Sequence, residues 1–530
     1  MKFVLKSFFQ ILVFIFIVFE VHGQQIQKLR VYFKDKGTID FNPYQYFDPK
    51  TIENRQKQNL PLYDISDAPV SRDYIVKVNT IADSTGFASR WFNFIVSWIS
   101  SELQYQQLTS LDFVDHIEII PTVTVIYTND PGIYDINNSN DDDPENLMKR
   151  QIERMGASCF RAEGINGKGV RIAVFDGGFP NVDQHEAFSH LRNEGRIIKT
   201  WDFIKNKEYV YYGNTHGRMT LACIAGIWKG QDMGLATGSE FLLAKTEIER
   251  EPYSEEEHWL AAAEWADKNG ANIISSSLGY GYNRYFTSDM DGKSSLVVKA
   301  AQVAARKGIL VINSAGNEAD SKWKGIITPS DGDSVLAIGG ISPETDYHIN
   351  FSSFGPTADK RLKPNVCAFG HVMSLSEHGL KEADGTSFSC PLVSGFAACA
   401  WQKLPDLNNM QLFREIEKSG DLYPYYDYAH GYGVPQAKYF TQKEKDKIER
   451  TFYFKESEND IIITVLPKVL NDSNNLLAAN YMYYHLSDSD SYLSEFNIII
   501  VKQREPLIIS RKEGQILRVF YRSFTDEFKM

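Results

Sequence analysis

The sequence predicts an α/β fold with a mainly parallel central sheet covered by helices on both faces, a three-layer arrangement. From Gln151 onward, short apolar runs alternate with segments of helical periodicity. Such runs suit strands that are buried on both faces, and parallel strands need crossover helices between them. The expected strands are Arg171–Phe175, Phe241–Lys245, Asn272–Ser276, Ile309–Asn313 and Val335–Gly339, with helices at Trp259–Asn269 and Ser295–Lys307.

Two smaller regions flank this α/β region. The first is expected to be an α+β domain with strands at Asp73–Val78, His116–Ile119 and Val123–Ile126 and a helix at Phe92–Leu103. After Lys443 the helices stop, and a β-sandwich-like module is expected, with strands at Thr451–Phe454, Asp460–Leu466, Phe496–Val501, Leu507–Ser510 and Ile516–Tyr521. The predicted boundaries are 1–23 for a signal peptide, 24–143 for the N-terminal domain with its linker, 144–442 for the α/β domain and 443–530 for the β module.

The first residues have the pattern of a secretory signal peptide. Lys2 and Lys6 precede the almost wholly apolar run Phe8–Phe19, and Val21–Gly23 offers a cut site. The uninterrupted run Ile11–Phe19 is well short of the ~20 residues that a membrane-spanning helix needs. We therefore expect a secreted or extracytoplasmic protein without a membrane span.

Composition excludes several classes of protein. The chain has 530 residues with 56 Lys and Arg against 68 Asp and Glu, which gives a net charge of −12 and argues against a nucleic-acid partner. The 5 cysteines are an odd number, so at least one is unpaired and a disulfide framework is not expected.

The stretch Asn137–Pro144 is polar, acidic and rich in turn-forming residues, which predicts an exposed linker open to proteolysis. Its oxygen ligands make a structural calcium site the alternative, but their spacing is not that of an EF-hand. We expect no metal site and no required cofactor.

Three separate stretches carry the residue types of a nucleophilic enzyme. The motif Asp384–Pro391 places Ser387 at the start of a buried helix, beside backbone N–H groups that lack helical partners. Asp176 ends a buried strand, and His216 opens another helical run. Taken alone, the Gly-Thr-Ser tripeptide is more typical of a loop whose serine caps a core helix.

The order Asp176, His216, Ser387 resembles that of the subtilisin-like (S8 family) serine proteases. The resemblance covers roughly Met148–Tyr439. Asn317, in the stretch Ile312–Glu318, resembles the family's oxyanion-binding asparagine; Ser277, Leu278 and Gly279 resemble its substrate-binding strand; and Lys363–Gly370 resembles the segment that leads toward the nucleophile.

The resemblance implies a secreted serine endopeptidase that acts on protein or peptide substrates through Asp176, His216 and Ser387. It also implies that the N-terminal domain is a propeptide that inhibits its own protease; the alternative is a structural domain retained in the mature protein. A non-catalytic peptide-binding protein on a protease scaffold is a second hypothesis. An esterase of the α/β-hydrolase type would need Gly-x-Ser-x-Gly, and Ser389 breaks that pattern.

Three residues depart from the family pattern. Gly177 stands where a small hydrogen-bonding residue is usual, and Phe388 follows the serine where methionine is usual. Arg218 places a cation close to the histidine, unless its long side chain reaches solvent.

Overall fold

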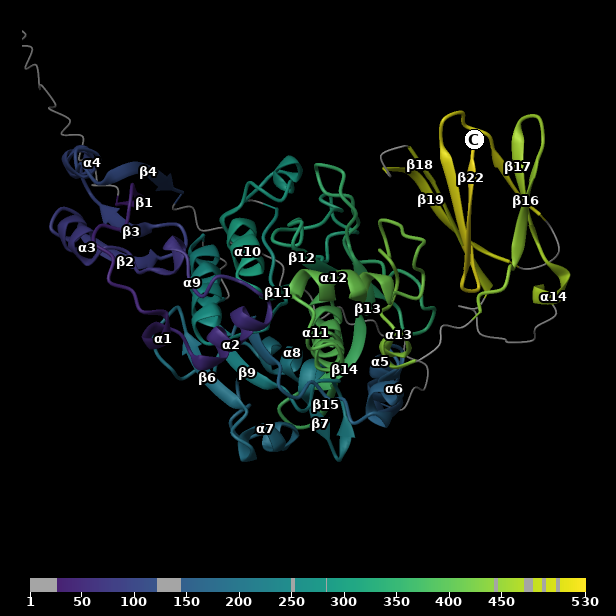
Figure 1. The fold of residues 1–530 in the computed structure, drawn as a ribbon, viewed down its shortest axis with the longest axis horizontal. Helices are drawn as coiled ribbons and strands as arrows, with labels where there is room; N and C mark the ends of the chain where they lie inside the picture. Colours follow the sequence, from purple (N-terminus) through teal and green to yellow (C-terminus); the bar gives the residue numbers. More distant parts are fainter. Residues whose placement is uncertain are drawn as a thin grey trace, which may run out of the picture. The chain divides into compact units, whose positions relative to one another are not determined.

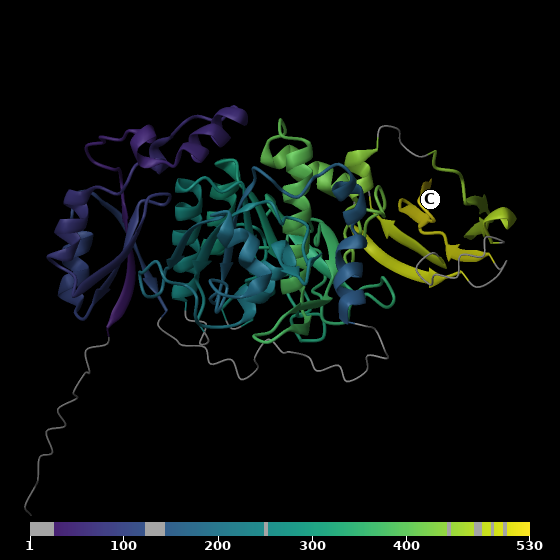
Figure 2. The ribbon, with the colours of Figure 1, turned by 90° about the horizontal axis from the view of Figure 1, so that it is seen from below.

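The computed structural model describes residues 26–121, 144–248, 253–282, 284–442, 447–470, 480–488, 492–501 and 506–530. The predicted signal peptide, the strand at 123–126 and nearly all of the predicted linker lie outside these residues. The chain forms two compact units: 1–35, 70–88 and 93–122 make the first, and 36–69, 89–92 and 123–530 make the second. Figures 1 and 2 show the ribbon in two views.

The first unit is a four-stranded sheet with two helices. Its strand order is β2-β3-β1-β4, and β1 pairs antiparallel with both β3 and β4. The bounds are β1 Gln27–Phe33, α3 Arg72–Asn79, β2 Ser84–Ser89, β3 Phe94–Ile99, α4 Glu102–Thr109 and β4 Val114–Ile120.

Two assignments in this unit were wrong. Asp73–Val78 is the helix α3 and not a strand, because Tyr74, Ile75 and Val78 together face the core while Val76 remains 55% exposed. Phe94–Ile99 is the strand β3 and not part of a helix, because its β-branched and aromatic residues pair with β1 along the whole strand. The predicted strand at His116–Ile119 is confirmed within β4.

The second unit contains a seven-stranded sheet, which is parallel as predicted. Its strands in order are β13 Val366–Phe369, β12 Val335–Ile341, β11 Leu310–Ser314, β10 Ile273–Ser276, β5 Arg171–Asp176, β9 Glu240–Lys245 and β6 Ile197–Asp202. The five predicted strands are confirmed, and the outer strands β6 and β13 were missed. β6 was missed because its half-buried residues lack a continuous apolar run.

Helices cover both faces of this sheet. Alternate strand residues such as Ile172, Leu243 and Ile312 share a core with α8 His216–Ala225 and α11 Thr386–Lys403. On the opposite face, the Phe175 ring packs against Trp259 of α9 Ser254–Lys268, and α10 Leu296–Arg306 packs beside α9. The remaining elements of this region are α5 Pro144–Glu153, α6 Ala157–Ala162, η2 Glu186–Phe188, α7 Ser189–Asn193, β7 Ile227–Trp228, β8 Gln231–Asp232, η3 Thr287–Asp289, β14 His371–Leu375, β15 Leu380–Asp384, α12 Asn409–Lys418 and α13 Ala437–Thr441.

The C-terminal part consists of two small sheets with a shared core, as predicted. The sheets are β16-β17-β20 and β19-β18-β21-β22, and Phe452 and Ile463 of the first pack with Leu486 and Val519 of the second. The bounds are β16 Phe452–Glu456, β17 Asp460–Val465, α14 Pro467–Leu470, β18 Tyr481–Ser487, β19 Leu493–Ile500, β20 Leu507–Ser510, β21 Ile516–Tyr521 and β22 Phe524–Lys529. The strands β18 and β22 were missed; β18 is buried on both faces, so it shows no alternation.

A tyrosine-rich loop joins this module to the α/β region. The His485 ring N–H donates to the Tyr426 carbonyl at 2.7 Å, and Leu493 N–H donates to the Tyr428 hydroxyl at 3.0 Å. Burial lowers the pKa of His485 to about 4, which keeps this imidazole neutral.

All five cysteines are free thiols, and four of them are buried. Within the described ranges, no helix is both long and apolar enough to span a membrane.

Candidate functional site

Asp176 lies at the carboxyl end of β5 and is buried. Its Oδ1 accepts a hydrogen bond from Gly177 N–H at 2.7 Å, and its Oδ2 accepts one from the Thr220 hydroxyl at 3.1 Å. The neighbouring glycine therefore still supplies a donor through its backbone. These two bonds fix the orientation of the carboxylate.

His216 is the first residue of α8, and its imidazole faces this carboxylate. Nδ1 lies 2.9 Å from Asp176 Oδ2 and 3.0 Å from Oδ1, so Nδ1–H is the donor and Nε2 is left as the proton acceptor. The helix start can approach β5 closely only because Gly217 has no side chain: a Cβ there would lie 2.2 Å from the Gly178 carbonyl oxygen. Thr220 lies one turn after His216 on the same helix, a signal that sequence reasoning did not use.

Ser387 is the second residue of α11 and is half-buried. Gly385 precedes the helix with φ of +139°, a conformation that residues with a side chain rarely adopt. The Ser387 hydroxyl donates to the Ser277 carbonyl at 3.3 Å. The ring of Phe388 lies 5.4 Å from the His216 ring, centroid to centroid, so the imidazole sits beside the start of α11.

A proline links the serine to the strand β10. Pro391 is inside α11 and has no N–H, so the carbonyl of Ser387, four residues earlier, lacks its helical donor. The Ser277 hydroxyl donates to that carbonyl at 2.7 Å. The pair of contacts between Ser277 and Ser387 therefore ties the helix start to the end of β10.

Asn317 follows β11, and its side chain reaches the same helix start. Its Oδ1 accepts hydrogen bonds from Thr386 N–H at 2.9 Å and from the Thr386 hydroxyl at 2.8 Å. This orientation leaves the Nδ2 donors next to the backbone at Gly385, where an added Cβ would lie 3.4 Å from Nδ2. Thr386 thus orients Asn317, a role that sequence reasoning missed.

Ser277, Leu278 and Gly279 continue β10 beyond the sheet. The last ladder partners of β10 are Phe175 and Asn313, both opposite Ser276. Asn313 Nδ2 donates to the Leu278 carbonyl at 2.9 Å, and Gly279 packs against Ile327. The segment therefore leaves the ladder in a fixed conformation at the carboxyl edge of the sheet, where α/β folds place their sites.

Arg218 is buried, so its side chain does not reach solvent. Its guanidinium donates to the Pro180 carbonyl at 3.4 Å, and burial lowers its pKa. The segment Lys363–Gly370 includes β13 and lies beside β12 in the sheet. It supports the core, and the Gly370 carbonyl accepts a hydrogen bond at 2.8 Å from the N–H of Gly385, which precedes α11.

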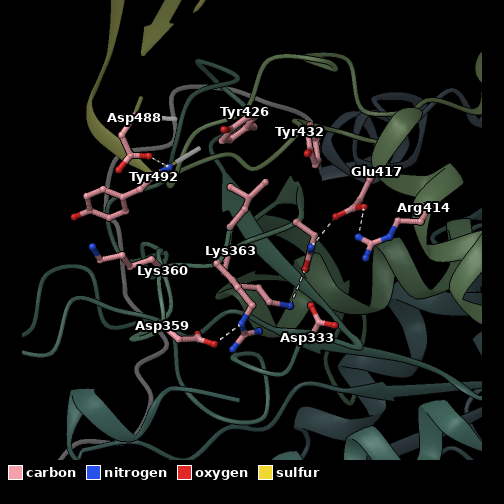
Figure 3. Close-up of a pocket in the computed structure, with 13 residues that line it drawn as sticks. Asp333, Asp359, Lys360, Lys363, Arg414, Glu417, Tyr426, Tyr432, Asp488 and Tyr492 are labelled. Carbon is pink, nitrogen blue, oxygen red and sulfur yellow. Dashed lines mark hydrogen bonds and ion pairs between the residues drawn. The ribbon is translucent and has the colours of Figure 1, made fainter. Parts of the chain in front are cut away.

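A separate cavity of about 580 Å³ lies away from these residues (Figure 3). Its charged groups largely satisfy one another: Arg361 pairs with Asp359 at 2.8 Å and Arg414 with Glu417 at 2.9 Å. Lys363 donates to the Val335 carbonyl, and burial lowers its pKa to about 7. The lining residues are Asp333, Asp359, Lys360, Arg361, Leu362, Lys363, Asn365, Arg414, Glu417, Tyr426, Tyr432, Asp488 and Tyr492.

Among the described residues no group of three or more His, Cys, Asp or Glu side chains is arranged to hold a metal ion. The acidic stretch considered for calcium, 137–143, lies outside them.

Comparison with known proteins gives two family matches. Residues 167–433, about half of the chain, match the model described as the subtilase family, Peptidase_S8. Residues 28–131 match the Peptidase S8 propeptide domain, Bacteroidota.

Individual relatives share about a quarter of their residues with this chain. Subtilisin DY of Bacillus licheniformis is 25% identical over 51% of this chain and 89% of the relative. Serine protease AprX of Bacillus subtilis (strain 168) is 27% identical over 48% of this chain and 62% of the relative. A crystal structure of MycP1 from the ESX-1 type VII secretion system aligns with 22% identity and a TM-score of 0.44, covering 59% of this chain and 89% of that chain.

Proposed function

The chain belongs to the subtilase family of serine endopeptidases, and from this premise we propose that Asp176, His216 and Ser387 form its catalytic triad. The single observation that carries the proposal is the approach of the His216 imidazole to Asp176 at 2.9 Å on one side and to the start of α11 on the other. A nucleophile, a base and a group that orients the base are thereby supplied by the ends of two helices and a strand.

In the proposed mechanism, His216 Nε2 takes the proton from the Ser387 hydroxyl as the oxygen attacks the peptide carbonyl. The imidazolium then gives this proton to the leaving amine, and an acyl-enzyme remains on Ser387. Water, activated by the same nitrogen, hydrolyses the ester. Asp176 keeps Nδ1 protonated and stabilises the imidazolium without taking the proton itself.

The negative oxygen of each tetrahedral intermediate would be bound by two donors. One is the Ser387 backbone N–H, which has no helical partner because it lies in the first turn of α11. The other is Asn317 Nδ2, supported by the two hydrogen bonds that Thr386 gives to Oδ1. Because these donors are held in place before the reaction, their orientation costs little when the charge develops.

The substrate is proposed to lie along Ser277, Leu278 and Gly279 as an added strand. Backbone pairing with an extended peptide requires a segment outside the sheet ladder, and this one follows the last ladder residue of β10. No cofactor takes part in this mechanism.

Two features of the N-terminal region complete the proposal. Residues 1–23 direct secretion, and the region matched by the propeptide model inhibits the protease until it is removed. The proposed sequence of events is export, cleavage after the N-terminal domain and release of the active enzyme.

A sulfonyl fluoride or an organophosphate tests the triad directly. The expected result is covalent modification of Ser387, found by peptide mass mapping, together with loss of casein hydrolysis. A protein that binds peptides but neither reacts with the reagent nor turns over casein would instead be the non-catalytic alternative.

A further inference from the structure

Part of the propeptide region packs as if it belonged to the protease body. We call residues 36–69 the strap; they include α1 Pro43–Tyr46, α2 Pro49–Lys57 and η1 Ile65–Asp67. By sequence the strap falls inside the propeptide match 28–131, yet it belongs to the same compact unit as the parallel sheet. The turn 89–92 also belongs to this compact unit.

A buried set of ion pairs joins the strap to α9. Arg55 on α2 donates to both oxygens of Asp67 at 2.8 and 3.1 Å and to both oxygens of Asp267 at 2.9 and 3.1 Å. The exposed fractions of these three side chains are 2%, 0% and 2%. Each carboxylate is therefore removed from water and accepts charge-assisted hydrogen bonds from the guanidinium.

Two further cations complete this set. Arg90, from the turn 89–92, donates to Asp67 at 3.0 Å and to Asp267 at 2.6 Å. Lys307, at the end of α10, lies 2.9 Å from Asp67. Burial alone would raise the pKa of Asp67, but its bonds to Arg55 and Lys307 hold that pKa well below the ordinary value.

The charges are complementary across the contact. Arg55 and Arg90 of the propeptide side face Asp267 and Glu264 of α9, and Lys307 after α10 faces Asp64 and Asp67 of the strap. If the strap and the turn 89–92 left, Asp267 and Glu264 would lose their arginines. A helix surface with this arrangement is suited to a partner that brings cations at these positions.

Neutral contacts extend the surface along three helices. The Thr51 hydroxyl donates to the carbonyls of Asp267 and Lys268, which lie in the last turn of α9. The Gln58 side chain donates to the Gly308 carbonyl at 2.9 Å and accepts from Asn409 N–H at 3.0 Å, where α12 begins. The strap therefore closes the end of one helix and bridges two others.

We infer that the ends of α9 and α10 with the start of α12 form a docking surface for the strap, so that the propeptide is held there independently of its contacts with the active site. The inference deepens the proposed inhibitory role of the propeptide and rests on it. Arg55 is the strap residue on which recognition depends most, because it donates to a carboxylate on each side of the contact.

The test uses the full chain carrying Ser387→Ala, with a recognition sequence for a site-specific protease inserted between residues 131 and 144. After the cut, size-exclusion chromatography and a dissociation rate measured by surface plasmon resonance follow the N-terminal fragment. The fragment is expected to remain bound. Arg55→Met is expected to raise the dissociation rate about tenfold or more, since it leaves two buried carboxylates short of a partner.

Arg72→Met is the matched control, because Arg72 is an exposed arginine on the same fragment; its dissociation rate is expected to stay within about twofold of the parent's. The double variant Arg55→Met with Asp267→Asn should dissociate more slowly than Arg55→Met alone, because removing one buried carboxylate compensates for the lost guanidinium charge. Equal rates for Arg55→Met and Arg72→Met would overturn the inference.

If Arg55→Met does not fold, Gln58→Ala replaces it, since it removes two hydrogen bonds without leaving a buried charge. A dissociation rate of the fragment about threefold or more above that of the parent chain supports the docking surface, and an unchanged dissociation rate rejects it. The assay does not use peptide hydrolysis. If the fragment stays bound but Ser387 of the unsubstituted chain does not react with the sulfonyl fluoride, the proposed function is refuted and the docking surface is still supported.

Discussion

The carboxylates of Asp176 and Asp267 are both buried, but their surroundings prepare them for different tasks. Asp176 is bound by two fixed donors and one imidazole, and that imidazole remains 29% exposed. Asp267 is bound by two guanidinium groups, and neither arginine side chain is more than 5% exposed. A carboxylate that orients a partly exposed histidine can support proton transfer, whereas one enclosed by arginines can only hold two segments together.

The largest effect on activity should come from substituting the residues of the proposed triad. Ser387→Ala or His216→Ala is expected to lower kcat on the order of 10⁶-fold, and Asp176→Asn about 10⁴-fold, because each removes the nucleophile, the base or the correct tautomer. Steady-state kinetics on a peptide substrate measure this loss. Circular dichroism melting curves should remain close to the parent's, and a variant that keeps full activity would contradict the assignment of its residue.

Asn317→Ala should come next, with a loss of about 10²–10³-fold in kcat and little change in KM. The reason is that the Nδ2 donors act on the oxyanion and not on the bound substrate. Thr386→Val serves as a control, because it keeps the Thr386 N–H bond to Asn317 and removes only the two bonds of the hydroxyl, to Asn317 and from Gly316 N–H. An increase in KM of similar size would show that Asn317 binds the substrate instead.

Acid should weaken the buried ion pairs that hold the strap against α9 and α10. The pKa of Asp67 is lower in the folded chain than its ordinary value of 3.8, so the stability that this group contributes is present above pH 4 and is lost as the pH falls further. Burial raises the pKa of Glu264, which has the opposite sign and offsets part of the loss. The dissociation rate of the cut N-terminal fragment, measured between pH 3 and pH 7, should rise on the acid side, and a flat profile would argue against Asp67.

The smallest effect concerns the hairpin that leads to the nucleophile. The hydrogen bond that His371 donates to Asp384 raises the pKa of His371 above its ordinary 6.5, and the two side chains lie 2.8 Å apart. This pair stabilises the fold fully below pH 6.5, and the contribution is lost as the pH rises through the raised pKa. His371→Asn should therefore lower the melting temperature by about 2–4 °C at pH 5.5 and by less at pH 9. An equal shift at both pH values would mean that the charge of His371 is not involved.

Much of the sheet and all of the residues proposed for the site could be found in the sequence. Buried parallel strands such as β5, β10 and β11 have compact apolar runs, and a strand end or helix start places Asp176, His216 and Ser387 where side chains meet. The supporting side chains Thr220, Thr386 and Ser277 were not recognised in these roles, because a single hydroxyl has no pattern that distinguishes it from any other.

The N-terminal region shows where local patterns fail. Tyr74, Val76 and Val78 alternate as they would in a strand, yet the segment is helical because Ile75 also packs into the core and Val76 does not. Packing against the core decided the secondary structure of this segment and overrode its local propensity.

The sequence alone determined the parallel α/β core and the order of three reactive side chains, since hydrophobic periodicity and residue type are local properties. Tertiary structure alone decided that Arg55 meets Asp267, 212 positions further along the chain, and that a stretch within the propeptide match packs with the protease body. The residues of such ion pairs are not spaced at any regular interval along the sequence, so only the folded chain reveals them.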